Sequence, residues 1–404
     1  MSENKTKGYL TGKEIRAISK ANAKEIKRLE AYKNRKCDES EYLSQMKNPE
    51  NILEIEDLHT FFYTEQGVVK AVNGVSYDVP KNKVVGVVGE SGCGKSVTSM
   101  SVMRLIQGPS GQIVDGAIRF KAYDYKRDDK GEPIPVENGK PGQFQMEEKV
   151  YDIAQMPIRE IHRIRGKQVA MIFQEPMTSL NPVFTIGEQL DEVTLIHVPG
   201  ATKEMAKEKS VEMLRLVGII PENVYDRFPH ELSGGMRQRV MIAMALAAEP
   251  RLIIADEPTT ALDVTIQAQI LDLLQDIKNK IDGSILLITH DLGVIAEMAD
   301  YVVVMYAGKV IEKGTVLEIF QDPRHPYTVG LQKSKPTMTL DDSTELYNIP
   351  GNVPNPVNMP QHCYFKERCA KCTAKCSGEY PGMVQVSPTH FVACHLYDGE
   401  NENG

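Results

Sequence analysis

A lysine, a serine and two acidic residues stand at spacings that suit a nucleoside triphosphate. Lys95 and Ser96 end the run Gly89–Ser96, which fits G-x-x-x-x-G-K-S/T. Backbone N–H groups of such a loop converge on phosphate, Lys95 would reach the β- and γ-phosphates, and Ser96 would ligate Mg²⁺. Asp256 and Glu257 end a later apolar run. Asp256 would hold Mg²⁺, largely through water, and Glu257 would be the general base for an attacking water.

The alternative for the first run is a glycine-rich turn with a solvated lysine. A β-branched run at 84–88 precedes the loop and a helical pattern at 96–106 follows it. Strand, glycine loop and helix form the context that phosphate binding requires. Cys93 is expected to turn its side chain away from the phosphates. The loop residues expected at the nucleotide are Gly89, Ser91, Gly92, Cys93, Gly94, Lys95, Ser96 and Val97.

A second anion site is expected in the run LSGGMRQR, residues 232–239. Ser233, Gly234 and Gly235 offer a hydroxyl and bare backbone donors at the start of a helix. One nucleotide does not need two such sites in one chain, so this turn is expected to close on a nucleotide held by another subunit. The alternative is a helix cap with two turn glycines.

Hydrophobic patterns predict the elements that position these residues. Alternation predicts two strands at 52–62 and 68–79, and apolar runs predict strands at 84–88, 169–173, 252–255 and 285–289. A hairpin is predicted at 301–306 and 308–314, and a helix at 203–217. The fold class is therefore expected to be α/β: a P-loop NTPase core with an antiparallel β subdomain, an inserted helical subdomain and a small Cys-rich C-terminal module.

Composition changes divide the 404 residues into three expected parts. Residues 1–50 form a charged N-terminal extension, either helical or partly disordered. Residues 51–322 form the nucleotide-binding domain, with a helical subdomain at about 176–232 and a surface insertion at about 121–150. Residues 323–404 form the C-terminal extension with the cysteine cluster.

Charge and hydropathy limit the partners and the location. The net charge of −8 argues against wholesale nucleic-acid binding. The sequence has no apolar run of 18 residues, and Met1–Lys7 is polar. The chain is therefore expected to remain in the cytosol.

The motifs together resemble the nucleotide-binding subunits of ATP-binding cassette (ABC) transporters, over roughly residues 51–335. They follow the family's order: Walker A at Gly89–Ser96, the Q-loop at Gln174, the signature at Leu232–Gln238, Walker B at Asp256 and Glu257, the D-loop at Ala261–Asp263, and the switch histidine at His290. Phe62, or Tyr63, stands where the family stacks an aromatic ring on adenine.

The resemblance implies further roles. Gln174 would sense the water and Mg²⁺, and Asp263 would lie at the seam with a homologous ATPase subunit. His290 would contact the γ-phosphate. Taken alone, a histidine at a strand end is more often structural.

The C-terminal part narrows the resemblance to the ATPases of oligopeptide and dipeptide importers. The runs that carry it are His325–Thr328, Gly330-Leu331, Ile349–Gly351, Ala393–Leu396 and Met171–Pro182. It implies two transmembrane permease subunits, an extracellular peptide-binding protein, and a peripheral position on the cytoplasmic face of the membrane. Import of nickel or a sugar, or a soluble ABC ATPase acting on ribosomes or DNA, are the alternatives.

Five of the seven cysteines lie in the last tenth of the chain. The resemblance implies a four-iron four-sulfur (4Fe-4S) cluster on Cys363, Cys369, Cys376 and Cys394. Cys369 and Cys372 form one C-x-x-C pair, which leaves zinc as the second choice and free thiols as the third.

Overall fold

The computed structural model describes residues 10–128, 132–136, 144–175, 179–260, 262–281, 283–334 and 347–399. Its longer helices are α1 (Gly12–Lys33), α2 (Lys95–Val102), α4 (Ile186–His197), α5 (Lys203–Leu216), α6 (Gly234–Leu246), α7 (Val264–Ile281), α8 (Leu292–Met298), α9 (Val316–Gln321) and α10 (Pro326–Lys333). Its strands are β1 (Asn51–Thr64), β2 (Gly67–Pro80), β3 (Val84–Val88), β4 (Gly111–Tyr125), β5 (Met146–Asp152), β6 (Val169–Ile172), β7 (Leu252–Asp256), β8 (Ser284–Ile288), β9 (Tyr301–Tyr306), β10 (Lys309–Thr315), β11 (Val384–Gln385) and β12 (Phe391–Val392).

The larger sheet of the described chain has the order β11-β12-β10-β9-β3-β8-β7-β6. Strands β6, β7, β8, β3 and β9 are parallel, and β10 pairs with β9 as the predicted hairpin. Alternate residues of β3 enter two different apolar clusters, Val84 and Val88 on one face and Val85 and Val87 on the other. Burial of both faces explains why this strand reads as a continuous apolar run.

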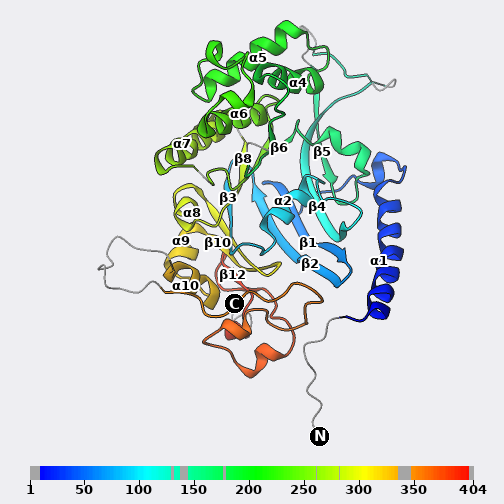
Figure 1. Cartoon of the computed structure of the whole chain (residues 1–404), viewed down its shortest axis with the longest axis vertical. Helices are drawn as coiled ribbons and strands as arrows, with labels where there is room; N and C mark the ends of the chain where they lie inside the picture. Colours follow the sequence, from blue (N-terminus) through cyan, green and yellow to red (C-terminus); the bar gives the residue numbers. More distant parts are fainter. Residues whose placement is uncertain are drawn as a thin grey trace.

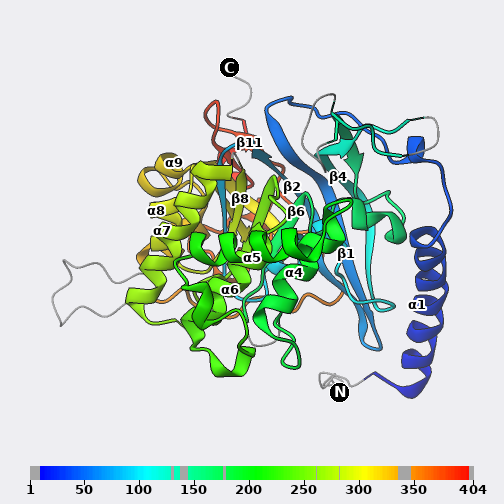
Figure 2. The same cartoon turned by 90° about the horizontal axis from the view of Figure 1, so that it is seen from above.

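The smaller sheet is antiparallel, with the order β2-β1-β4-β5. It shares one apolar cluster with α2 and the facing side of the larger sheet. Helices α7, α8 and α9 lie on the other side of the larger sheet, so the layers run from helices through two sheets to α1 (Figure 2). The expected α/β class with an antiparallel subdomain is confirmed.

Two element boundaries differ from the prediction. Part of the expected insertion at 121–150 is strand, because β4 continues to Tyr125 and pairs with β5. The pairing was not predicted because both strands contain charged residues, which break the apolar pattern. Lys121 is buried beside Glu148, and Asp124 accepts a hydrogen bond from Tyr151. Residues 129–131 and 137–143 of the insertion lie outside the described chain.

The helix after the phosphate loop is also shorter than predicted. It ends at Val102 rather than Ile106, and Arg104 follows with a left-handed backbone, φ 52°. The guanidinium of Arg104 donates to the carbonyl of Ala154 at 2.8 Å, which holds the chain in its new direction.

Helices α4, α5 and α6 gather at one end of the molecule, and the C-terminal region lies at the opposite end (Figure 1). The predicted start of the helical subdomain, residues 176–178, is outside the described chain. In the N-terminal extension, Thr11 and Glu14 form a capping box that begins α1. This helix runs along the outside of the smaller sheet (Figures 1 and 2).

Candidate functional site

Glycines shape the predicted phosphate loop between β3 and α2. Gly92 and Gly94 have φ of 78° and 100°, a left-handed region that side chains disfavour. A Cβ on Gly94 would lie 2.4 Å from the carbonyl oxygen of Ala71. Cys93 between them is buried in the apolar cluster under the loop. The loop thus requires glycine for its backbone, as sequence and local geometry both indicate.

Lys95 is the first residue of α2 and is 5% exposed. Its Nζ donates to the carbonyl of Gly89 at 2.7 Å and to that of Glu90 at 3.3 Å. The ammonium group therefore bridges the first two residues of the loop, at the positive N-terminal end of the helix. This places the ammonium group of Lys95 where it could contact a bound phosphate.

Ser96 lies next to the acidic end of β7. Its Oγ donates to Oδ1 of Asp256 at 3.0 Å. Burial raises the pKa of Asp256, and the negative charge of Glu257 adds to this, while the hydrogen bond from Ser96 lowers it. A hydroxyl beside a carboxylate at the carboxyl ends of parallel strands is an oxygen donor set that suits Mg²⁺.

Two other predicted catalytic residues, Gln174 and His290, lie next to the carboxylate of Glu257. Gln174, exposed just after β6, donates from Nε2 to Oε2 of Glu257 at 3.0 Å. His290, after β8, has Nδ1 3.4 Å from Oε1, and Thr260 donates to Oε2 at 2.9 Å. Glu257 has a left-handed backbone, φ 47°. Its N–H donates to the carbonyl of Ile288, the last residue of β8. The four side chains come from the ends of three adjacent strands and the loop after β7.

The Ser233–Gly235 turn has a different setting. Ser233 is the N-cap of α6, and its Oγ accepts from the N–H of Met236 at 3.4 Å. Ser233 and Gly234 are exposed, and a Cβ on Gly234 would meet no atom within 4 Å. Further along this helix, buried Gln238 donates to the carbonyl of Pro258 at 2.6 Å, which links α6 to the loop after β7.

Two other predicted positions lie at the margins of this site. Asp263 is exposed at the start of α7, and its Oδ1 accepts from the N–H of Ile266 at 3.0 Å. Ala261 of the same motif lies outside the described residues. Phe62 is half-buried in β1, with its ring against Gly111 of β4. The role of Phe62 in stacking on adenine stays a prediction.

The cysteine cluster is loop-borne. Cys376 and Cys394 are buried, Cys363 and Cys369 are half-buried, and Cys372 is exposed. Among the described residues, no group of three or more His, Cys, Asp and Glu side chains is arranged to hold a metal ion. Burial raises the pKa of Cys363 and of Cys394 to about 11, and the other thiols of the predicted set add to both shifts.

Three polar contacts at the site were not predicted. Thr260 touches the Glu257 carboxylate, while Tyr327 and Arg368 of the C-terminal region touch Glu90 in the phosphate loop. Thr260 follows Glu257 by three residues and could have been found from that spacing. Arg368 lies 278 residues from Glu90 in the sequence, so no local sequence pattern could have predicted that the two side chains pair.

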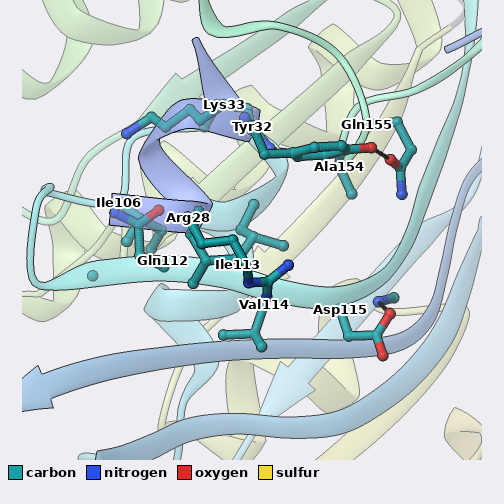
Figure 3. A pocket seen from close by; sticks show the side chains of 14 residues that line it. Arg28, Tyr32, Lys33, Ile106, Gln112, Ile113, Val114, Asp115, Ala154 and Gln155 are labelled. Carbon is teal, nitrogen blue, oxygen red and sulfur yellow. Dashed lines mark hydrogen bonds between the residues drawn. The ribbon is translucent and has the colours of Figure 1, made fainter. Parts of the chain in front are cut away.

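A separate hollow of about 180 Å³ lies between α1 and the smaller sheet (Figure 3). Arg28, Tyr32 and Lys33 line it from the helix and Gln112 from β4. Arg28 is paired with Glu25, Lys33 lies 3.5 Å from Glu30, and Tyr32 donates to Gln155. The Arg28 and Lys33 pairs lie within the helix. The helix is bound to its surroundings by Tyr32, which donates to Gln155, and by Gln112 of β4, which donates to Glu30 at 2.5 Å. None of the predicted nucleotide residues lines the hollow.

Comparison with known proteins agrees with this geometry. Residues 72–260 match the family described as ABC transporter, and residues 311–376 match the oligopeptide/dipeptide transporter C-terminal region. The oligopeptide transport ATP-binding protein OppD of Bacillus subtilis (strain 168) is 48% identical over 346 residues, 85% of this chain and 88% of the relative. The dipeptide transport ATP-binding protein DppD of the same organism is 45% identical over 355 residues, 88% of this chain and 97% of the relative.

Solved structures share the fold. The dimeric post-hydrolysis structure of the ATP-binding cassette MJ0796, bound to ADP and Pi, has a TM-score of 0.52 at 22% identity, covering 65% of this chain and 98% of that chain. CbiO1 from Clostridium perfringens, part of the ABC transporter complex cbiONQ, has a TM-score of 0.50 at 23% identity and covers 70% and 96%.

The motifs, the cassette fold and relatives that match along most of both chains lead to one assignment. The chain belongs to the ATPases of ABC transporters, in the group that carries the oligopeptide/dipeptide transporter C-terminal region.

Proposed function

We propose that this ATPase powers the import of oligopeptides or dipeptides through a membrane complex. The observation that carries the proposal is that the similarity to OppD and DppD extends through the C-terminal region, beyond the cassette that ABC ATPases share. Two transmembrane permease subunits would form the path, and an extracellular peptide-binding protein would deliver the cargo.

A homologous ATPase subunit completes the site in this proposal. ATP and Mg²⁺ bind at Lys95, Ser96 and Asp256 of one subunit, and the exposed Ser233–Gly235 turn of the other closes on the phosphates. Support comes from the way the turn lies free at the start of α6 while the catalytic carboxylate is already surrounded in its own chain. Backbone donors at a helix N-terminus stabilise the charge that develops on the transferred phosphate.

Glu257 would take the proton from the attacking water in the closed dimer. Gln174 and Thr260 orient its carboxylate by hydrogen bonds to Oε2, and His290 faces Oε1. The His290 side chain is 63% exposed, so it is free to turn toward the γ-phosphate when nucleotide and partner arrive. A positioned general base of this kind contributes about 10²- to 10⁴-fold to the rate.

The proposed position is peripheral, on the cytoplasmic face of the membrane. No helix in the described parts of the chain is long and apolar enough to cross a bilayer. Contact with the permease would be made near Gln174 and by the helical subdomain. Val183, Phe184 and Ile196 of this subdomain are exposed and offer apolar surface to a cytoplasmic helix.

The test is uptake by a reconstituted complex. This chain, its partner ATPase, the two permeases and the binding protein are assembled in proteoliposomes with MgATP on the ATPase side. We expect a labelled tri- or tetrapeptide to accumulate, and a complex with Glu257→Gln to fail. Uptake of Ni²⁺ or a sugar without peptide would assign another cargo to the same machinery. ATP hydrolysis stimulated by ribosomes or DNA in place of the permeases would overturn the import function.

We also propose that Cys363, Cys369, Cys376 and Cys394 hold a 4Fe-4S cluster. In support, Cys363, Cys369 and Cys376 all raise the pKa of Cys394, and Cys369 and Cys376 raise that of Cys363, after the larger effect of burial. The ligands of a cluster stand farther apart than those of one ion, because iron and sulfide lie between them. Thiolate ligands on short, irregular segments suit such a cluster, and a single zinc is the second choice.

Metal analysis after anaerobic purification tests the cluster. We expect about four iron and four sulfide per chain, with charge-transfer absorption that is lost in Cys363→Ser and kept in Cys372→Ser. Cys372 is the matched control because it is exposed. One zinc per chain, or no metal, would contradict the proposal.

A further inference from the structure

Two side chains of the C-terminal region hold the second residue of the phosphate loop, Glu90. The Oη of Tyr327, on α10, accepts the backbone N–H of Glu90 at 2.8 Å. Arg368 donates to both oxygens of the Glu90 carboxylate, at 2.7 and 2.9 Å. A bidentate pair of this kind fixes both distance and orientation. The loop is therefore held through its backbone and its side chain by one distant segment.

Arg368 is itself held in place. Its side chain is 5% exposed, and its Nε donates to the carbonyl of Pro350 at 3.0 Å. The guanidinium lies 5.7 Å from the ring centre of Tyr306 and 5.8 Å from that of Phe365. A planar cation beside two aromatic rings, with its remaining donors used, keeps one orientation. The two N–H groups that Arg368 donates to Glu90 are therefore held in one orientation.

Tyr327 is equally constrained. It is fully buried, and its ring lies 4.8 Å from Tyr306 and 5.5 Å from Phe365, centre to centre. Its own N–H donates to Nδ1 of His325, which caps α10. The hydroxyl therefore meets Glu90 from a rigid aromatic cluster.

Glu90 in turn connects to the groups that would meet phosphate. Its carbonyl accepts from Nζ of Lys95 at 3.3 Å and from the N–H of Cys93 at 3.3 Å. An unpaired carboxylate in this loop would repel a bound triphosphate, and Arg368 neutralises that charge. The contacts thus act on the shape of the loop and on its electrostatics.

We propose that Arg368 and Tyr327 are positioning residues for the phosphate loop, through which the C-terminal region sets the affinity of this ATPase for nucleotide. The inference rests on nucleotide binding at Gly89–Ser96. If the unmodified chain binds no MgATP analogue, that binding site fails. If it binds and the variants below match it, only the inference fails.

The first test removes a single oxygen. Tyr327→Phe keeps the packing and leaves the Glu90 N–H without its acceptor. We expect the Kd for a non-hydrolysable MgATP analogue, measured by calorimetry on the full chain, to rise about 2- to 10-fold. In the assembled ATPase the KM for ATP should rise in proportion while kcat at saturating ATP is kept.

The matched control is Tyr364→Phe. Tyr364 also lies in the C-terminal region, and its hydroxyl accepts from Asn73 at 3.0 Å, away from the loop. Both variants lose one hydrogen bond, so their thermal unfolding should shift alike. A Kd equal in the two variants would overturn the role of Tyr327.

The second test uses the charge of Glu90. Arg368→Gln leaves the carboxylate unpaired in the loop, and we expect the Kd to rise about tenfold or more. Adding Glu90→Gln removes the repelling charge, so the double variant should bind more tightly than Arg368→Gln alone. A purely structural contact predicts that the second substitution adds damage or changes nothing, and either result would overturn the proposal.

Discussion

The Glu257 cluster and the Ser233–Gly235 turn are the two halves of the proposed nucleotide site, and they differ in completeness. Around Glu257, Gln174 and Thr260 already donate hydrogen bonds of 3.0 and 2.9 Å, and His290 lies 3.4 Å from the carboxylate. At Ser233, the hydroxyl caps its own helix, and the neighbouring Gly234 is exposed with open space around it. The fold alone assembles the catalytic half, whereas the anion-binding half is presented outward. The proposed dimer follows from this difference.

The largest expected effect comes from the complete half. Glu257→Gln keeps the shape of the side chain and removes the base, so steady-state hydrolysis by the assembled ATPase should fall about 10²- to 10⁴-fold. Binding of MgATP should be retained, because the substitution leaves Lys95 and Ser96 unchanged.

Glu297→Gln on α8 is the control, since Glu297 is exposed. Hydrolysis at the unmodified rate in Glu257→Gln would show that the cluster around this carboxylate does not contain the base.

A roughly tenfold loss of hydrolysis is expected from a substitution in the Ser233–Gly235 turn. Gly234→Ala has space for its methyl group and favours the helix, so the chain should fold normally. The methyl would stand between the backbone donors and a partner's nucleotide, and hydrolysis by the assembled dimer should fall about tenfold. Nucleotide binding to the single chain should not change.

Gly12→Ala is the matched control, because Gly12 is the first residue of α1 as Gly234 is of α6, and it also has open space. If Gly234→Ala weakened nucleotide binding in the isolated chain, the turn would belong to the chain's own site, and the comparison of the two halves would collapse.

The link between the halves gives a smaller effect. Gln238→Leu removes the donor to the Pro258 carbonyl and leaves that oxygen unsatisfied in the interior. We expect the free energy of unfolding to fall by about 1–3 kcal/mol, measured by urea denaturation. A few-fold loss of hydrolysis in the assembled dimer should accompany it; full activity would show that the halves are coupled elsewhere.

The smallest expected change in stability is a gain in the catalytic half. Burial raises the pKa of Asp256, so its ionised form destabilises the nucleotide-free fold, and stability is lost as pH rises through that pKa. Asp256→Asn should raise the free energy of unfolding by about 0.5–2 kcal/mol at pH 7 and abolish hydrolysis. The gain should shrink at pH 4, where the native carboxyl is protonated more fully; a loss of stability at pH 7 would contradict this.

The two halves also differ in how far sequence could predict them. The glycine loop, the buried strands and the signature turn are local patterns, so their elements were predicted to within a few residues. The contacts of Gln174 and His290 with Glu257 depend on strand order, which a local pattern does not specify. The domain limits and the site roles stay predictions.

Two failures have physical causes. The predicted insertion at 121–150 was too long because its ends belong to the paired strands β4 and β5. These strands contain charged residues such as buried Lys121, so they lack the apolar pattern from which a strand is predicted. The Arg368–Glu90 pair was missed because it joins segments 278 residues apart, and only the folded chain brings them together.

The pairing of β12 with β10 has a consequence for shortened forms of the protein. Glu312 and Lys313 of β10 pair with β12, and only the two-residue β11 follows at the margin, just before Ser387 and Pro388. A short border strand next to a proline resists recruitment of foreign strands. Cutting the chain after α9 would uncover the edge of β10 at Glu312 and Lys313, and such a fragment should self-associate even though its motifs are intact.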